Sequence, residues 1–288
     1  MKCGLVVLVG RSNVGKSTLL NTLVGTKIAA TSFRAQMTRH VIHGVLNAPE
    51  GQAVFVDTPG VFKEGKSKLS AKLTNKVQDA IKDIDLIVYV ADPTREIGVE
   101  ERYVYGLIRH LDIPKLLVVN KSDLSKRERP YQEDYEAWSK DFAGMFLLSA
   151  LRGSHIQPLH NKVMELLPEG QALYPPEQLT NVDEYFFIGE IIREKIFSVL
   201  DKEVPYSTTV EVDSVEQTVF GKDKVDGLHI TARILTNNER YKKIIIGKGA
   251  YKIKEIGQMA RRELEAATGK KIFLELGVFV DRHWVERI

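Results

Sequence analysis

The sequence predicts an α/β domain, with a mostly parallel sheet covered by helices on both faces, followed by a smaller α+β domain. Within residues 1–170, short apolar runs alternate with amphipathic segments, which is typical of a parallel sheet buried on both sides. Residues 171–181 are rich in Pro and polar side chains and are typical of a linker. Residues 182–288 begin with a helical pattern and continue with two adjacent strand-like stretches, which favours an α+β module.

Composition and charge narrow the class of protein. The chain has 288 residues and a formal net charge of +3, which by itself does not indicate a nucleic-acid-binding protein. Its apolar runs fall well short of the roughly 20 residues that a membrane-spanning helix needs. The single cysteine, Cys3, excludes an intramolecular disulfide and fits a reducing compartment, so we expect a cytoplasmic protein.

The expected strands of the first domain end in loops that carry unusual sequences. Right-handed crossovers place the loops after parallel strands at one edge of the sheet, where ligands bind. We therefore expect the motifs of this domain to converge there. Strands are predicted over 4–9, 53–60, 85–93, 116–119 and 145–150, and helices over 16–25, 70–84, 100–111 and 156–168.

The first motif is "GRSNVGKS", residues 10–17, between a predicted strand and a predicted helix. It fits the pattern G-x-x-x-x-G-K-[ST], whose glycines let the backbone curl so that its N–H groups face phosphate oxygens. Lys16 is expected to reach the β- and γ-phosphates and Ser17 to bind Mg²⁺. A Gly-rich loop without a ligand is the alternative, and the strand–loop–helix context disfavours it. The expected phosphate-binding residues are Asn13, Val14, Gly15, Lys16, Ser17 and Thr18.

The second motif is "DTPG", residues 57–60, at the end of a predicted strand. Asp57 is placed to hold Mg²⁺ through a water molecule, and the Gly60 N–H to sense a γ-phosphate. Alone, this motif is weak evidence for a nucleotide site. In this order after a phosphate-binding loop, it is strong evidence.

The third motif, "NKSD" at residues 120–123, indicates which base is bound. The Asp123 carboxylate can accept both the N1–H and the 2-amino group of guanine, and adenine lacks that pair of donors, so ATP should be rejected. Asn120 would tie the loops together and contact the base, and the stem of Lys121 would cover its face. In "SA", Ser149 and Ala150, the Ala150 N–H would donate to guanine O6.

These motifs, in this order, resemble those of the P-loop GTPases related to translation factors. "YPPEQLTNVDEYFFIGEIIREKIF" resembles the linker and first helix of the Era family, "IIIGKGAYKIKEIGQMARRELE" its KH module and "LEL" its closing strand. The resemblance extends from residue 4 to about 280. It implies a P-loop GTPase domain over 1–170, a linker over 171–181 and a KH-type RNA-binding domain over 182–288, with GTP or GDP and Mg²⁺ bound.

The resemblance also implies how GTP is hydrolysed. Val61 occupies the position where some GTPases carry a water-orienting Gln, so we expect slow hydrolysis by the protein alone. Thr38 matches the switch threonine that completes the Mg²⁺ shell when GTP is bound, although Met37 departs from the family pattern Q-T-T-R or Q-S-T-R. Asn13 matches an asparagine that binds K⁺ in related GTPases, and a loop-capping amide is the alternative. The expected catalytic residues are Lys16, Thr38 and Gly60.

The second domain concentrates positive charge at residues 240–254, which include six Lys or Arg and no acid. Within this stretch "GKGA", residues 247–250, resembles the G-x-x-G loop with which KH modules clamp about four single-stranded nucleotides. Ala250 stands where the family pattern has Gly. We expect it in the first turn of a helix, where Ala is tolerated, and we expect the loop to clamp RNA more weakly. Tyr251 could stack on a base or pack in the fold. The expected RNA-binding residues are Gly247, Lys248, Gly249, Ala250, Tyr251, Lys252 and Lys254.

The family resemblance implies the partners too. It implies a monomeric switch that binds the 3′ end of small-subunit ribosomal RNA and the 30S-type particle, with a peripheral contact at the inner face of the cell membrane. The alternative is a GTPase whose output is protein or membrane binding, with a KH domain that does not bind RNA specifically. A GTPase that assists tRNA modification is disfavoured, because those relatives lack a KH module.

Overall fold

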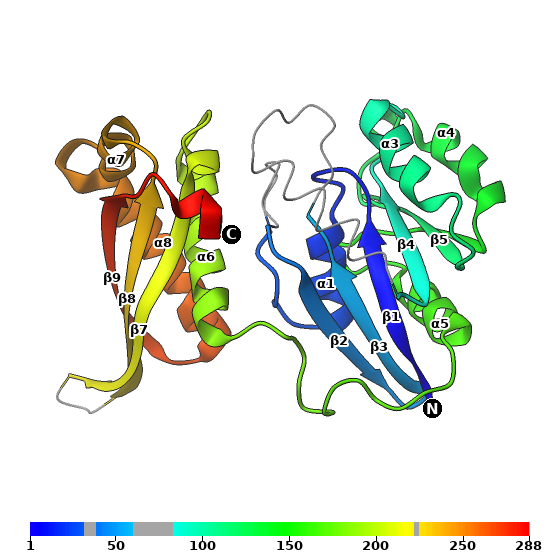
Figure 1. Cartoon of the computed structure of the whole chain (residues 1–288), viewed down its shortest axis with the longest axis horizontal. Helices are drawn as coiled ribbons and strands as arrows, with labels where there is room; N and C mark the ends of the chain where they lie inside the picture. The colour runs from blue at the N-terminus through cyan, green and yellow to red at the C-terminus, as the bar shows by residue number, and fades with distance from the viewer. Residues whose placement is uncertain (32–38, 60–82, 222–224, 288) are drawn as a thin grey trace. The chain divides into compact units, whose positions relative to one another are not determined.

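The computed structural model describes residues 1–31, 39–59, 83–221 and 225–287. The chain forms two compact units, Met1–Asn181 and Val182–Ile288 (Figure 1). Nearly all of the helix expected at 70–84 lies outside the described residues.

The first unit is built on a six-stranded sheet in the order β2-β3-β1-β4-β5-β6. The β2–β3 pair is antiparallel, and every other neighbouring pair is parallel. The mostly parallel sheet expected from the sequence is therefore confirmed. The strands are β1 (Lys2–Val9), β2 (Ile42–Ala48), β3 (Gly51–Asp57), β4 (Leu86–Ala91), β5 (Lys115–Val119) and β6 (Gly144–Leu147).

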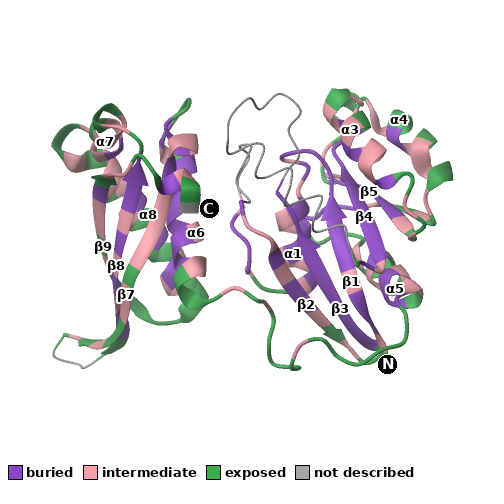
Figure 2. Ribbon diagram, viewed as in Figure 1, coloured by how far each residue is buried: buried purple, intermediate pink, exposed green. Residues whose placement is uncertain are grey.

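Helices cover both faces of this sheet, as expected. On one face, α3 (Val99–Ile108) and α4 (Gln132–Ala137) bury side chains against alternate residues of β1, β4 and β5. On the other, α1 (Lys16–Val24) contacts β2 and β3, and α5 (Ile156–Leu166) contacts β1, β3 and β6. The central strands are buried along most of their length, which explains their continuous apolar sequences (Figure 2).

The sequence-based strands do not include β2. It is the antiparallel edge strand and pairs with β3 through a tight connection after Ala48. Its sequence mixes apolar residues with His43, Gly44 and Asn47, so it has neither the continuous apolar run of a buried strand nor a clear alternation.

The expected linker packs on the first unit. We call residues 173–181 the edge segment, because they run along β2 and β3. The Val45 N–H donates to the main-chain oxygen of Leu179 at 2.8 Å. Gln52, which is buried in β3, accepts the N–H groups of Leu173 and Tyr174 at 2.8 and 2.9 Å. Main-chain and side-chain hydrogen bonds therefore fix this part of the chain to the sheet.

The second unit is an α+β module with a three-stranded sheet in the order β7-β8-β9. Strands β7 (Thr208–Phe220) and β8 (Val225–Thr236) are antiparallel, and β9 (Lys271–Val280) is parallel to β8. Helices α6 (Glu184–Val199) and α8 (Tyr251–Thr268) pack together, and their apolar residues share a core with those of β8 and β9. Among the described residues, none of the helices is apolar and long enough to span a membrane.

A further helix, α7 (Glu239–Ile246), precedes the glycine loop and is absent from the element order expected from the sequence. Its start carries a recognisable signal, because the side chain of Asn238 accepts a hydrogen bond from the Tyr241 N–H at 2.9 Å. Its end is marked by Gly247. The helix has only eight residues and ends in three consecutive isoleucines, residues 244–246, so its sequence resembles that of a short strand.

Candidate nucleotide site and candidate RNA-binding loop

The loop after β1 curls as the first motif requires. Gly10 and Gly15 have φ values of 151° and 100°, and Gly15 caps the N-terminus of α1. A Cβ at Gly15 would lie 2.3 Å from Nδ2 of Asn120, so this position has no room for a side chain. Asn13 adopts φ 65°, a left-handed conformation that Asn tolerates better than most residues. The loop therefore presents main-chain N–H groups at the start of a helix, where anions bind favourably.

Lys16 folds back over this loop. Its Nζ donates to the main-chain oxygens of Gly10 and Arg11, each at 3.0 Å. Burial lowers the pKa of Lys16 to about 8, although the charges of Asp57 and Glu100 act in the opposite direction. A desolvated ammonium at a helix N-terminus has a strong electrostatic preference for an anionic ligand.

Ser17 and Asp57 lie together at the same end of the sheet. The Ser17 hydroxyl donates to Asp57 Oδ2 at 2.5 Å, and Asp57 is fully buried at the end of β3. A hydroxyl and a carboxylate are oxygen ligands of the kind that Mg²⁺ prefers, so this pair fits the ion. Thr38 and Gly60, the other residues expected near it, lie outside the described residues, as do Met37 and Val61.

The loop after β5 is hydrogen-bonded to two other loops. Asn120 Nδ2 donates to the main-chain oxygen of Val14 at 2.8 Å, and its Oδ1 accepts the Ala150 N–H at 2.9 Å. Asp123 Oδ1 accepts the hydroxyl of Ser149 at 2.5 Å. The structure thus brings together residues from all three loops. Because the Ala150 N–H already donates to Asn120, its contact with guanine O6 stays a prediction.

Two acidic residues that the sequence motifs do not include support these loops. Asp92 pairs with Lys121, with 2.5 Å between Oδ2 and Nζ. Glu101, in the first turn of α3, pairs with Arg11 in the phosphate loop, with 2.6 Å between Oε1 and Nε. Both carboxylates are almost fully buried. The only sequence signal for Asp92 is its place directly after a buried strand, and Glu101 is indistinguishable from an ordinary helix acid.

The glycine loop of the second unit has an unusual backbone. Gly247 has φ 73° and ψ 170°, and a Cβ there would lie 3.0 Å from Cγ of Lys252. Gly249 and Ala250 both adopt left-handed angles, with φ 60° and 61°, and the Tyr251 N–H donates to the main-chain oxygen of Lys248. The expectation that Ala250 lies in the first helical turn is therefore wrong. The two consecutive left-handed residues form a tight turn that joins α7 to α8.

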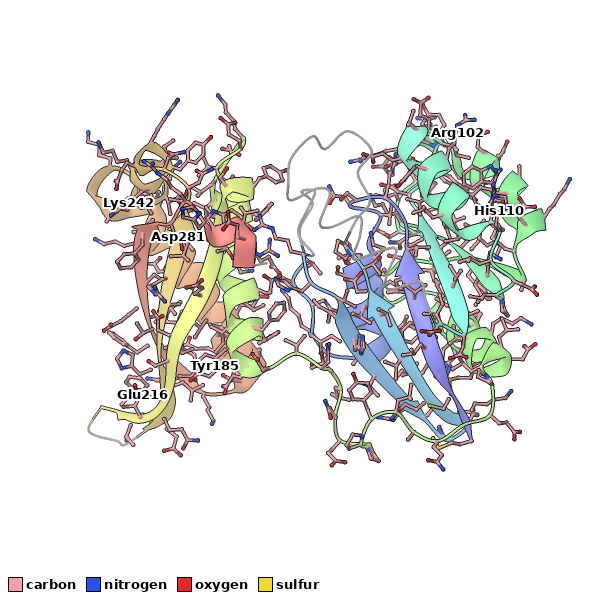
Figure 3. The ribbon with its side chains drawn as sticks, in the orientation of Figure 1. Arg102, His110, Tyr185, Glu216, Lys242 and Asp281 are labelled. Carbon is pink, nitrogen blue, oxygen red and sulfur yellow. The ribbon has the colours of Figure 1, made fainter. Side chains whose placement is uncertain are left out.

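The side chains around this turn are exposed and basic. Lys248 and Lys254 are exposed, and Lys252 is half-buried beside Gly247. Tyr251 is 67% exposed, so it does not pack in the core. Lys242 lies on α7 with its ammonium 6.0 Å from the ring centroid of Phe279 (Figure 3). An exposed aromatic ring can stack on a base, and the lysines beside it can neutralise phosphates.

Comparisons with known families match each unit separately. Residues 5–121 match the family described as "50S ribosome-binding GTPase". Residues 203–285 match the family described as "KH domain".

Comparisons with whole proteins extend over both units. GTPase Era of Thermoanaerobacter sp. (strain X514) is 41% identical over 289 residues, which are 98% of this chain and 92% of the relative. GTPase Era of Lactobacillus delbrueckii subsp. bulgaricus (strain ATCC BAA-365 / Lb-18) is 42% identical over 285 residues, with the same coverage.

Two solved structures are similar over the whole chain. One is a variant of Aquifex aeolicus Era bound to GDP·AlF4⁻, with a TM-score of 0.89 and 34% identity over 100% of this chain and 96% of the other. The second is Era in complex with MgGDPNP and nucleotides 1506–1542 of 16S ribosomal RNA, with the same TM-score, identity and coverage. Similarity of this extent, in sequence and in structure, shows that the chain belongs to the Era family and is a GTP-hydrolysing enzyme.

Proposed function

We propose that the protein is a GTP-dependent switch that binds the 3′ end of small-subunit ribosomal RNA and acts in the assembly of that subunit. One observation carries the proposal. The nucleotide motifs lie together in the first unit, whereas the basic glycine loop belongs to the second unit, which supports a separate phosphate ligand for that loop. The similar Era structure that holds 16S ribosomal RNA supports RNA as that ligand.

In the first unit, the loop from Asn13 to Thr18 binds the phosphates of GTP through its N–H groups. Lys16 exchanges its two main-chain acceptors for β- and γ-phosphate oxygens and stabilises the charge that develops there. Asn120, Asp123 and Ala150 bind guanine. The stem of Lys121 covers the face of the base. The motif after β5 selects guanine over adenine, because the Asp123 carboxylate pairs with donors that adenine lacks.

The Ser17 hydroxyl, and Asp57 through a water molecule, are suited to hold Mg²⁺, and Thr38 is proposed to complete the coordination shell when GTP is present. When bound, Mg²⁺ neutralises charge on the β- and γ-phosphate oxygens. The Gly60 N–H senses the γ-phosphate. Val61 can neither orient water nor carry a proton, so hydrolysis by the protein alone is proposed to be slow. K⁺ at Asn13 stays a prediction, with a loop-capping amide as its alternative.

In the second unit, the turn from Gly247 to Ala250 approaches the RNA backbone closely because its glycines carry no side chains. Lys248, Lys252 and Lys254 neutralise phosphates, and Tyr251 stacks on a base. GTP favours the RNA-bound state, and hydrolysis then releases the RNA.

The test is binding of an RNA that copies the 3′ end of small-subunit ribosomal RNA, beside a scrambled RNA of the same composition. We expect tighter binding of the native sequence. Lys248→Gln and Lys254→Gln should each make the log–log dependence of affinity on salt shallower by about 0.7, because each variant neutralises one phosphate fewer. Lys270→Gln, at an exposed position after α8, is the control and should leave the slope unchanged. Equal binding of both RNAs, with no effect of these lysines, would favour a protein or membrane partner instead.

A further inference from the structure

A buried acid outside the nucleotide motifs lies beside the base-binding loop. Asp92 directly follows β4, and its side chain is 1% exposed. Its Oδ2 accepts a hydrogen bond from Lys121 Nζ at 2.5 Å. Its Oδ1 accepts the Thr94 N–H at 3.0 Å and the Thr94 hydroxyl at 2.7 Å. With both oxygens engaged, the carboxylate is held in one orientation.

The backbone on either side of Lys121 is held as well. Lys121 has φ 63°, which is unfavourable for a residue with a Cβ. The Asn120 N–H donates to the main-chain oxygen of Ala91, and the Ser122 N–H to that of Leu148, each at 3.0 Å. Both ends of the Lys121 side chain are therefore fixed, its backbone by the end of β4 and the loop after β6, and its ammonium by Asp92. The Lys121 side chain as a whole is 31% exposed, so part of it stays available to a ligand.

The electrostatics favour a charged pair. Burial acts to raise the pKa of the Asp92 carboxyl, but hydrogen bonds from Lys121 and Thr94 outweigh it and hold the pKa below its ordinary value. Asp92 is thus ionised at neutral pH and attracts the ammonium. Fixing a long side chain before the ligand arrives removes an entropy cost that binding would otherwise carry.

We propose that Asp92 is a positioning residue of the nucleotide site: it contacts no nucleotide and holds Lys121 so that the lysine stem forms a fixed wall against the face of the base. The inference rests on the proposed function, in which Lys121 covers guanine. The ring face of hypoxanthine is nearly the same as that of guanine, whereas the edge that Asp123 reads differs by the 2-amino group. Loss of Asp92 therefore weakens the binding of GDP and of IDP by the same factor.

The experiment measures the Kd of GDP and of IDP for the full chain and for Asp92→Asn, Lys121→Met and the double variant. Asp92→Asn should weaken both nucleotides on the order of tenfold, within the range of couplings between contacting residues. The double variant should bind no more weakly than Lys121→Met, because Asp92 acts through the lysine. Glu128→Gln is the matched control: Glu128 is an exposed acid that bonds to Ser125 near the same loop, and its loss should change the Kd by less than about twofold.

Three results would overturn the inference: unchanged affinity in Asp92→Asn, a changed ratio of GDP to IDP affinity, or additive losses in the double variant. If Asp92→Asn does not fold, Thr94→Val repeats the test in a milder form, since it removes the hydroxyl bond to Oδ1 and keeps both the main-chain N–H bond and the charge of the carboxylate. A loss shared equally by GDP and IDP supports the inference there, and full affinity opposes it. A wild-type chain that fails to prefer GDP over ADP would instead contradict the proposed function.

Discussion

Asn120 Nδ2 donates to the main-chain oxygen of Val14 at 2.8 Å, so the loops after β5 and β1, proposed to bind the base and the phosphates, are bonded to each other before any ligand arrives. The Oδ1 of the same side chain accepts the Ala150 N–H at 2.9 Å. One buried amide thus holds three loops that are distant in sequence. The arrangement pre-organises both ends of the nucleotide site.

Replacing this amide should therefore cost both stability and affinity. Asn120→Ala leaves the Val14 oxygen and the Ala150 N–H without their buried partner, which costs roughly 1–3 kcal/mol for each group. We expect the unfolding free energy of the first unit, measured with denaturant, to fall by about 2–6 kcal/mol. Asn161→Ala, at an exposed position of α5, should change it by less than about 0.5 kcal/mol. An Asn120→Ala variant as stable as the wild type would show that the bonds do not hold the loops together.

Nucleotide binding should take up a proton above neutral pH. In the free protein the pKa of Lys16 is about 8, because burial disfavours the charged ammonium. Phosphate oxygens beside Nζ favour the charged form, so binding raises this pKa. Near and above pH 8, part of the free protein carries a neutral Lys16 that must gain a proton on binding. Calorimetry of GDP binding at pH 8.5 in buffers of different ionisation enthalpy should reveal that uptake.

The same linkage sets the pH dependence of affinity. GDP affinity should be constant below the pKa of about 8 and fall above it, by at most about tenfold per pH unit. Guanosine, which has no phosphate, is the matched control ligand and should show no proton uptake. GDP binding with no uptake at pH 8.5 would mean that Lys16 is fully charged before the phosphates arrive.

The elements that the sequence predicted well are those whose signal is local. The buried strands β1, β3, β4 and β5 carry continuous apolar runs, and the phosphate loop needs glycines that are visible in "GRSNVGKS". By contrast, the left-handed turn at Ala250 follows from how α7 meets α8, because Ala has no local preference for that conformation. Asp92 acts through a contact with Lys121, 29 residues away in sequence, which no local pattern indicates.

The strained turn at Ala250 predicts a stabilising substitution. Ala at φ 61° costs roughly 1–2 kcal/mol, and Gly does not incur this cost, although it gains entropy in the unfolded chain. Ala250→Gly should therefore stabilise the second unit by roughly 0.5–1 kcal/mol. Ala266→Gly, at an exposed position in the last turn of α8, should destabilise it by up to about 1 kcal/mol. Thermal unfolding of both variants checks the opposite signs, and destabilisation by Ala250→Gly would contradict the turn geometry.

The edge segment should loosen in acid. His43 Nδ1 lies 2.8 Å from the hydroxyl of Tyr174, and burial lowers the pKa of His43 below 6.5. The unfolded chain therefore takes up a proton first as the pH falls. The stability that the neutral ring provides is present above pH 6.5 and is lost as the pH falls through the lowered pKa.

This pH dependence can be isolated by comparing variants. Between pH 7 and pH 5, the unfolding midpoint of the first unit should fall less steeply in His43→Gln than in the wild type. The exposed His110, labelled in Figure 3, offers the control, and His110→Gln should keep the wild-type slope. Equal slopes in the wild type and His43→Gln would mean that this histidine does not couple the edge segment to pH.

In the proposed function, the nucleotide bound to the first unit controls RNA binding by the second. The most direct measurement is the Kd of the 3′-end RNA for the full chain loaded with a non-hydrolysable GTP analogue or with GDP. We predict tighter binding in the GTP-analogue form by about 5- to 150-fold, the usual range of coupling between linked sites, and an equal gain in the affinity for the analogue relative to GDP when RNA is bound. The same Kd in both nucleotide states would show instead that the nucleotide site and the RNA site act independently.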